Sequence, residues 1–262
     1  MKRILFAVFT FFMFISMYAQ QSAEVDYTYI ENPGIEIPFD YKLITSENNS
    51  VYFELERQAE YLNQVKTTQE GEAFYDFSGL NEAITKNKLY IDFDKGTNTE
   101  VLHIKNKATH IHDLPPRLDW NITDENKEIG DYIAIKAEVT FRGRDYETWF
   151  TPEIPISAGP WKLHGLPGLI LEAKDNTNTF YWLAERVKYP IDFDEEILVV
   201  DNKKAEVKIE IQEYVKTRIK GLGKLKNIYA SRAKNDLENH NIEAAAVIPG
   251  RETWLESVYE WE

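Results

Sequence analysis

Two histidines separated by one residue are the side chains best suited to metal chemistry. His110 and His112 lie in the stretch THIHD at residues 109–113, and an extended backbone would place both imidazoles on one face. Neutral imidazoles at this spacing can share a zinc or copper ion, with Asp113 or His103 as a further ligand. A zinc site needs three or four convergent ligands, and the sequence places only two. We therefore predict no metal and no other cofactor, and the simpler interpretation is two histidines on a surface loop.

Signatures of the common hydrolytic mechanisms are missing from the sequence. It contains no Gly-x-Ser-x-Gly nucleophile elbow, no His-Glu-x-x-His helix and no phosphate-binding glycine loop. It also has no cysteine, which excludes disulfides, thiolate metal ligands and cysteine nucleophiles. Whether the protein is an enzyme stays open, but we predict no catalytic residues and favour a non-enzymatic protein.

The first 19 residues have the order of a cleavable secretory signal peptide. Lys2 and Arg3 form a basic start, residues 4–17 are almost wholly apolar, and Ala19 precedes the expected cleavage site. The apolar run is shorter than the roughly 20 residues of a spanning helix, so a retained membrane anchor is the weaker alternative. We expect residues 1–19 to be removed near Ala19, leaving a periplasmic or secreted protein with no membrane span.

The net charge of the chain is −14, with 30 Lys and Arg against 44 Asp and Glu. Removal of Lys2 and Arg3 with the signal leaves 28 basic residues and a net charge of −16. A chain this acidic repels nucleic-acid phosphates and anionic lipid surfaces. We therefore exclude nucleic-acid binding, and the acidic composition most simply provides solubility.

Alternating apolar and polar residues predict a sheet over the N-terminal two thirds of the chain. Residues 132–141 are the clearest case, because every second residue from Ile133 to Phe141 is apolar. This period is typical of antiparallel sheets with one wet face. A hairpin turn is predicted at Arg142-Gly143-Arg144. The other predicted strands are 25–30, 50–57, 88–94, 100–105, 146–150, 169–174, 179–187 and 197–200.

The period changes near Val207, where apolar residues begin to recur every three or four positions. Gly221 and Gly223 are expected to separate two helices, near 203–219 and 224–238, although Val207, Ile209 and Ile211 also alternate as in a strand. Strands followed by helices indicate an α+β fold. We predict one domain over residues 20–262, with a large curved antiparallel sheet and one or two C-terminal helices.

Residues 151–168 contain four prolines and three glycines between two predicted strands. Residues 166–169, Leu-Pro-Gly-Leu, predict a type II turn with glycine at its third position. A loop of this length is usually functional or packed on itself. In the functional interpretation it displays Trp149, Trp161 and His164 as a lid or docking ridge. We favour the structural interpretation, in which the glycines and prolines set turns and the leucines fill the core.

The same segment carries a family resemblance. Residues 165–170 spell GLPGLI, with WFTP at 149–152 and Gly-Pro at 159–160. The chain resembles the GLPGLI family of exported bacterial proteins over roughly residues 24–240, most strongly from 111 to 175. Many members have a cysteine between 132 and 137, where this chain has Ala134. The resemblance implies a secreted or periplasmic protein of unknown activity. The candidate motif residues are Trp149, Pro152, Gly159, Pro160, Gly165, Leu166, Pro167, Gly168, Leu169 and Ile170.

Three function hypotheses follow from these features. The favoured one is a non-enzymatic binding or carrier protein for an apolar ligand, because aromatic residues recur in predicted strands 25–30 and 179–187 and occupy both faces of the latter. The second is an accessory module that docks on an outer-membrane or secreted partner, which an exposed Trp161 or Trp254 would favour. The third, a metal-dependent or hydrolytic envelope enzyme, rests on His110 and His112 alone.

Overall fold

The computed structural model describes residues 21–32, 37–55, 87–105, 107–221, 223–224, 256 and 258–259. These residues form a twelve-stranded sheet in the order β12-β6-β5-β4-β3-β2-β1-β11-β10-β9-β8-β7. Neighbouring strands are antiparallel except β12 and β6, which are parallel. The strands are β1 (Ala23–Glu31), β2 (Ile37–Thr45), β3 (Asn49–Glu54), β4 (Lys88–Asp92), β5 (Thr97–Ile104), β6 (Lys107–Asp113), β7 (Asn121–Ile129), β8 (Tyr132–Phe141), β9 (Arg144–Thr151), β10 (Leu169–Asp175), β11 (Phe180–Lys188) and β12 (Val207–Glu210).

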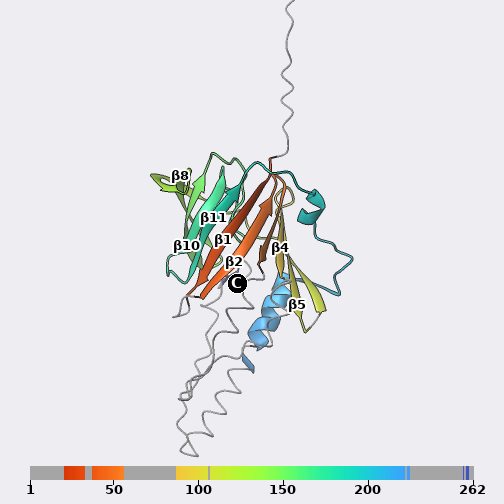
Figure 1. The fold of residues 1–262 in the computed structure, drawn as a ribbon. Helices are drawn as coiled ribbons and strands as arrows, with labels where there is room; N and C mark the ends of the chain where they lie inside the picture. Colours follow the sequence, from red (N-terminus) through yellow and green to blue (C-terminus); the bar gives the residue numbers. More distant parts are fainter. Residues whose placement is uncertain are drawn as a thin grey trace, which may run out of the picture.

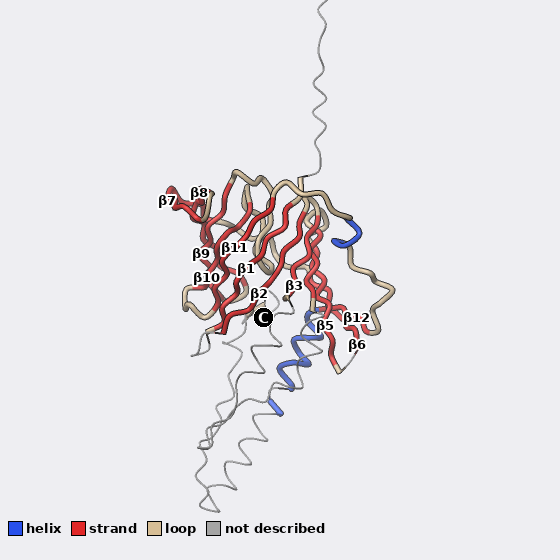
Figure 2. The backbone as a smooth tube through the Cα atoms, viewed as in Figure 1, coloured by secondary structure: helices blue, strands red, loops and turns tan. Residues whose placement is uncertain are grey.

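The sheet is strongly curved and stays open, with β7 at one edge and β12 at the other (Figure 1 and Figure 2). We call its inner face the one that carries Val25, Tyr27 and Tyr29 of β1, and the opposite face the outer face. These three side chains are at most 7% exposed, while their neighbours along β1 are only partly buried. The loop at residues 152–168 packs on the inner face and joins the same hydrophobic core. The sheet therefore has one buried side and one largely wet side, as the alternating sequence predicts.

Much of the predicted sheet is confirmed. The strand predicted at 132–141 is β8, and seven further predicted strands overlap β1, β3, β4, β5, β9, β10 and β11. The hairpin turn is also present: Arg142 and Gly143 have φ of 46° and 83° between the paired Phe141 and Arg144. Positive φ at both central residues defines the type I′ turn that two-residue hairpins prefer.

Other predictions were wrong. Residues 197–200 do not form a strand, because the short 3₁₀ helix η2 (Glu195–Leu198) occupies this place and Asp194 caps it by accepting a hydrogen bond from the Glu196 amide at 3.0 Å. Strands β2, β6 and β7 were not predicted. The C-terminal helix does not begin near 203, since residues 207–210 form β12 and the helix runs over 211–221.

The C-terminal helix packs Ile211 and Val215 against Ile111 of β6. Gly221 is still helical, so the expected break does not fall on it. The second predicted helix lies almost wholly outside the described residues, as does the predicted signal peptide. Within the described part of the chain, no helix has the length and hydropathy needed to cross a membrane.

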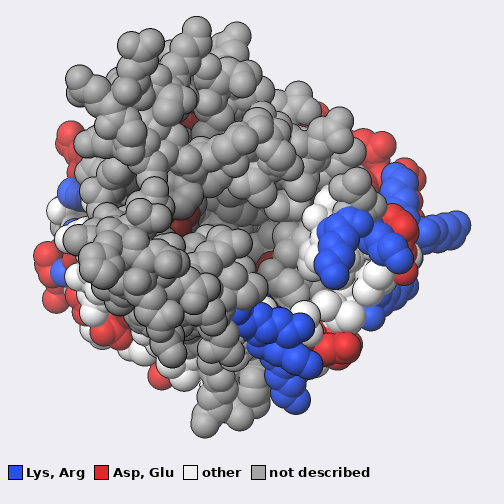
Figure 3. All heavy atoms as spheres, turned by 90° about the horizontal axis from the view of Figure 1, so that it is seen from below, with Lys and Arg blue, Asp and Glu red and all other residues white. Residues whose placement is uncertain are grey.

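Acidic and basic side chains lie side by side on the described part of the surface seen from below (Figure 3). Several of the carboxylates on the outer face are paired, such as Glu24 with Lys42 at 2.7 Å and Glu172 with Lys127 at 2.5 Å. These lysines therefore neutralise part of the negative charge on the outer face.

Candidate ligand cavity

The glycines of the GLPGLI segment permit close backbone contacts. A Cβ atom on Gly168 would lie 2.2 Å from the Thr151 carbonyl oxygen, and one on Gly159 would lie 2.6 Å from the Leu163 carbonyl oxygen. The predicted type II turn is not formed. The Gly168 amide instead donates to the Leu166 carbonyl at 2.8 Å, which is a three-residue turn around Pro167. The Leu169 amide donates to the Ile154 carbonyl at 3.1 Å. It therefore does not donate to Leu166, which is the hydrogen bond that would close a type II turn over residues 166–169.

The motif residues lie mostly in the core. Leu166, Leu169 and Ile170 are at most 1% exposed, and the Ile170 carbonyl accepts a 2.5 Å hydrogen bond from the Tyr27 hydroxyl of β1. The other buried residues of the motif are Trp149, Gly159, Pro160 and Gly168. Its exposed residues are Pro152, Gly165 and Pro167. The geometry agrees with a structural role, and a functional role of the motif stays a hypothesis.

Trp161 stands at the point where the loop reaches the inner face. It is 8% exposed, and its ring stacks on Trp182 of β11 at a centroid distance of 6.2 Å and an interplanar angle of 5°. Its φ of 52° is unusual for a residue with a side chain and costs about 1–2 kcal/mol. The surrounding contacts must offset this cost. The burial of Trp161 does not favour the interpretation as a docking ridge, and Trp254 lies outside the described residues.

The other two aromatic side chains of the functional interpretation are not gathered with Trp161. Trp149 lies on the outer face, where the Lys127 ammonium covers its ring at 4.3 Å. His164 is partly buried and packs on Phe93 with a centroid distance of 5.2 Å. The loop therefore does not present these three residues as one surface.

Lys162, next to Trp161, lies in a buried ion cluster. Its ammonium is 2.7 Å from Glu100 of β5, 3.1 Å from Asp113 of β6 and 2.8 Å from Glu256 near the C-terminus. The Arg142 guanidinium binds Asp113 through two hydrogen bonds of 2.7 and 2.8 Å and also contacts Glu256. The cluster ties the loop and the β8–β9 turn to two strands and the C-terminal segment.

The electrostatics of the buried ion cluster favour its charged form. Burial alone would raise the pKa of Asp113, but Arg142 and Lys162 outweigh burial and lower it. Burial likewise opposes a charged Lys162, yet Glu100, Glu256 and Asp113 raise its pKa. Because the Lys162 and Arg142 side chains are fully buried, these pairings offset the cost of removing the charges from water.

An aromatic cavity of about 220 Å³ lies on the inner face beside this cluster. Two stacked pairs contribute to its wall: Trp161 with Trp182, and Tyr41 with Tyr52 at 4.7 Å and 7°. Its lining consists of Tyr29, Tyr41, Tyr52, Asn87, Lys88, Leu89, Glu100, Leu102, Trp161 and Trp182. The Tyr52 hydroxyl and the Asn87 Oδ1 are buried and have no hydrogen-bond partner among the described residues. These residues come from β1 to β5, β11 and the loop, so no local sequence signal could have shown the cavity.

Glu54 lies on β3 opposite Tyr41 and is 9% exposed. Burial raises its pKa from 4.5 to about 7, so the folded state binds more protons than the unfolded chain between these values and becomes less stable as pH rises through them. We expect Glu54→Gln to be more stable than the wild type at pH 8, on the order of 3 kcal/mol, with no difference below pH 4.5. Urea unfolding of both proteins at pH 8 and below pH 4.5 measures this difference in stability. The exposed Glu128→Gln is the control, and an equal gain of Glu54→Gln at both pH values would contradict the assignment.

The histidine pair does not assemble a metal site. His110 and His112 do lie on one face of β6, the outer one, but Asp113 faces inward to Arg142. The His112 Nδ1 lies 3.3 Å from the Thr99 hydroxyl, and His110 is 2% exposed. The interpretation as a surface loop was therefore wrong. Among the described residues, no three His, Cys, Asp or Glu side chains are placed to hold a metal ion.

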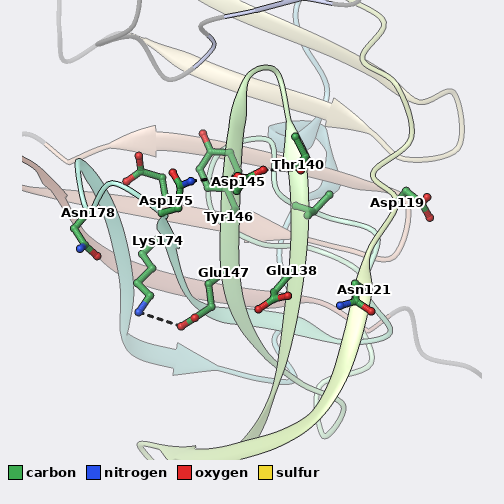
Figure 4. A pocket seen from close by; sticks show the side chains of 12 residues that line it. Asp119, Asn121, Glu138, Thr140, Asp145, Tyr146, Glu147, Lys174, Asp175 and Asn178 are labelled. Carbon is green, nitrogen blue, oxygen red and sulfur yellow. Dashed lines mark hydrogen bonds and ion pairs between the residues drawn. The ribbon is translucent and has the colours of Figure 1, made fainter.

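A larger cavity of about 660 Å³ lies on β8, β9 and β10 and contains mostly polar side chains (Figure 4). Four of its five carboxylates are already bound: Glu147 by Lys174 at 3.1 Å, Asp145 by the Thr140 hydroxyl at 2.6 Å, Asp175 by Arg144 at 2.8 Å, and Glu138 by Lys136 at 3.2 Å. Because most of these groups are paired within the protein, this cavity is a weaker candidate than the aromatic one.

The fold and the cavity define a class of protein: an open, curved antiparallel sheet whose inner face carries a packed loop and a small aromatic cavity. A family model described as a protein of unknown function (Porph_ging) matches residues 142–172. This match runs from the β8–β9 turn to β10 and contains the GLPGLI hexapeptide. No curated protein matches the chain in sequence.

The fold resembles that of a solved structure, and weaker matches are found to others. The structure of PNGF-II matches with a TM-score of 0.51 and 17% identity, over 75% of this chain and 32% of the PNGF-II chain. This chain therefore spans about a third of PNGF-II, and at this identity the likeness concerns the fold alone. A LolA superfamily protein from Nitrosomonas europaea matches with a TM-score of 0.30 and 11% identity, over 70% of this chain and 92% of its own. The structure of MucB in complex with MucA(peri) matches with a TM-score of 0.33 and 8% identity, over 70% of this chain and 55% of the matched chain.

Proposed function

We propose that this is an exported, non-enzymatic binding protein of the cell envelope, whose aromatic cavity holds a compact apolar or aromatic group. The observation that carries the proposal is the lining of that cavity, with two tryptophans, three tyrosines and two leucines. Export rests on the expected signal peptide at residues 1–19, and a periplasmic or secreted location follows from it.

The size of the cavity limits the ligand. An apolar cavity of about 150 Å³ accommodates benzene, and sites for drug-sized ligands span about 300–1,000 Å³. A cavity of about 220 Å³ therefore fits one ring or a group of similar bulk. The ligand inserts one such group, rather than a whole lipid, between the loop and the sheet.

The two alternatives have less support. A docking module that uses Trp161 as an anchor conflicts with the burial of that side chain. An enzyme built on His110 and His112 lacks a third ligand among the residues that the structure describes. The cavity needs neither a metal nor a catalytic group to bind a ligand.

Filling the cavity tests the proposal. We expect the mature wild-type protein to bind small single-ring compounds, and Leu89→Trp to bind them at least tenfold more weakly because the indole takes their space. Titration followed by ¹H–¹⁵N NMR measures both affinities. Leu102→Phe is a milder second variant, since Leu102 also lines the cavity.

Leu114→Trp is the matched control, because Leu114 is 72% exposed and lies outside the cavity. It should bind as the wild type does. The proposal fails if the wild type binds none of these compounds, or if folded Leu89→Trp and Leu102→Phe bind them with wild-type affinity.

A further inference from the structure

The polar groups of the aromatic cavity include hydrogen-bond acceptors that have no partner among the described residues. The Asn87 Oδ1 and the Tyr52 hydroxyl oxygen are buried and have no partner among the described residues, and Glu100 adds a carboxylate to the lining. An unsatisfied buried polar atom costs about 1–3 kcal/mol. A ligand that brings a donor or a positive charge would remove this cost.

The one positively charged residue in the described lining, Lys88, does not direct its charge into the cavity. Lys88 pairs with Phe53 of β3, and its ammonium lies over the Phe53 ring at 5.4 Å. Successive strand residues point to opposite faces, so Leu89 faces the inner side and the Lys88 side chain faces the outer side.

The neighbouring ion cluster is also net negative. Lys162 and Arg142 carry two positive charges, while Glu100, Asp113 and Glu256 carry three negative charges. The three carboxylates surround the Lys162 ammonium and occupy its three N–H donors, so none is left for an anionic ligand.

Glu54 of β3 lies opposite Tyr41 and adds a carboxyl group near the tyrosine wall of the cavity. Because its pKa is raised to about 7, it is only partly charged at neutral pH, and the negative charge of the surroundings comes chiefly from the ion cluster. The aromatic lining, the unpaired acceptors and the net negative ion cluster together favour a positively charged ligand. Aromatic side chains bind cations through the negative potential of their rings, most strongly where water is excluded.

We infer that the cavity binds an organic ammonium ion, with its alkyl groups against the Trp161–Trp182 and Tyr41–Tyr52 pairs and a donor directed to Tyr52 and Asn87. This inference rests on the proposed function and names its ligand class. The ammonium group belongs either to a free small molecule or to a lipid headgroup, which share this chemistry.

Choline and 3,3-dimethylbutan-1-ol form the matched probe pair, because they share shape and hydroxyl group and differ in charge. We expect the wild-type protein to bind choline at least tenfold more tightly than the neutral alcohol, measured by NMR titration. Tyr52→Phe should weaken choline binding about threefold to tenfold, because it removes the hydroxyl acceptor. Tyr181→Phe is the control, since Tyr181 of β11 points to the face opposite Trp182 and should leave the affinity unchanged.

Each outcome separates the inference from the proposed function. Equal or tighter binding of the neutral alcohol overturns the ammonium ligand but leaves an apolar cavity. If neutral ring compounds bind and choline does not, the inference also fails while the proposed function stands. If none of the three binds, both fail. Co-sedimentation with phosphatidylcholine vesicles, competed by free choline and absent with phosphatidylglycerol vesicles, assigns the group to a lipid headgroup. Choline binding without vesicle binding assigns it to a free molecule.

Discussion

Replacing Gly168 by alanine is expected to destabilise the protein more than the same replacement at any other glycine that the structure describes. The new Cβ would lie 2.2 Å from the carbonyl oxygen of Thr151 and 3.0 Å from the Cα of Pro152. These are backbone atoms at the end of β9, so no side chain can rotate away, and the start of β10 would have to separate from β9. Adding a methylene to a well-packed core, where side chains and backbone can shift, costs about 1–3 kcal/mol. Because the atoms in the way here belong to the backbone, we expect a loss of about 3 kcal/mol or more. Urea unfolding followed by circular dichroism measures it.

Two other glycines serve as controls for this substitution. Gly221 lies in the C-terminal helix with open space around it, so Gly221→Ala should be neutral or stabilise by up to about 1 kcal/mol. Gly96 also has open space but a φ of +62°, so Gly96→Ala should cost about 1 kcal/mol for backbone conformation alone. A Gly168→Ala protein with a wild-type unfolding midpoint would show that the loop is not held against β9 as described.

Replacing Lys162 by methionine is expected to have the second large effect. Methionine keeps much of the length of the side chain but leaves Glu100, Asp113 and Glu256 facing one another with Arg142 as the cation that remains from the cluster. Breaking a buried ion pair by removing one partner costs about 3–5 kcal/mol. We expect a loss of this size at pH 7 in denaturant unfolding. The loss should shrink toward pH 4, because protonation relieves the repulsion between the carboxylates.

Lys95→Met is the control for the loss of a lysine charge. Lys95 also makes a short ion pair, 2.6 Å from Asp92, but its side chain is 75% exposed. Exposed pairs contribute about 0–1 kcal/mol, so this variant should unfold close to the wild type. The double variant Lys162→Met/Glu100→Gln should recover part of the lost stability, since it removes the carboxylate whose ion-pair partner is Lys162, while Asp113 and Glu256 keep Arg142. If it is no more stable than Lys162→Met, the cluster is not governed by charge balance.

These two sites explain how the loop serves the cavity. Gly168 fixes where the loop leaves β9 and enters β10, and Lys162 fixes its tip against β5, β6 and the C-terminal segment. Trp161 directly precedes Lys162 and has its unusual backbone conformation while stacked on Trp182. We propose that the prolines and glycines of the motif position one wall of the cavity.

The sequence by itself determined the strands whose apolar residues alternate and whose neighbours are close in the chain. The β8–β9 hairpin is the best example, because one face of β8 is apolar and Arg142-Gly143 forms a two-residue turn. Strand β7 gave no such signal. It is an edge strand with the sequence NITDENKEI and mostly exposed side chains, so no apolar period marks it. The alternation from Val207 to Ile211 was ambiguous, since one strand and one helix meet there.

Only the tertiary structure decided the cavity and the ion cluster. The five members of the cluster, Glu100, Asp113, Arg142, Lys162 and Glu256, are far apart in the sequence, and curvature of the sheet brings them together. In an acidic chain, any of many carboxylates could have been chosen to pair with Lys162. Local patterns record which face of a strand is buried, because burial depends on the period of one segment. They do not record which residues meet on that face, because this depends on strand order and on the path of the loop across the sheet.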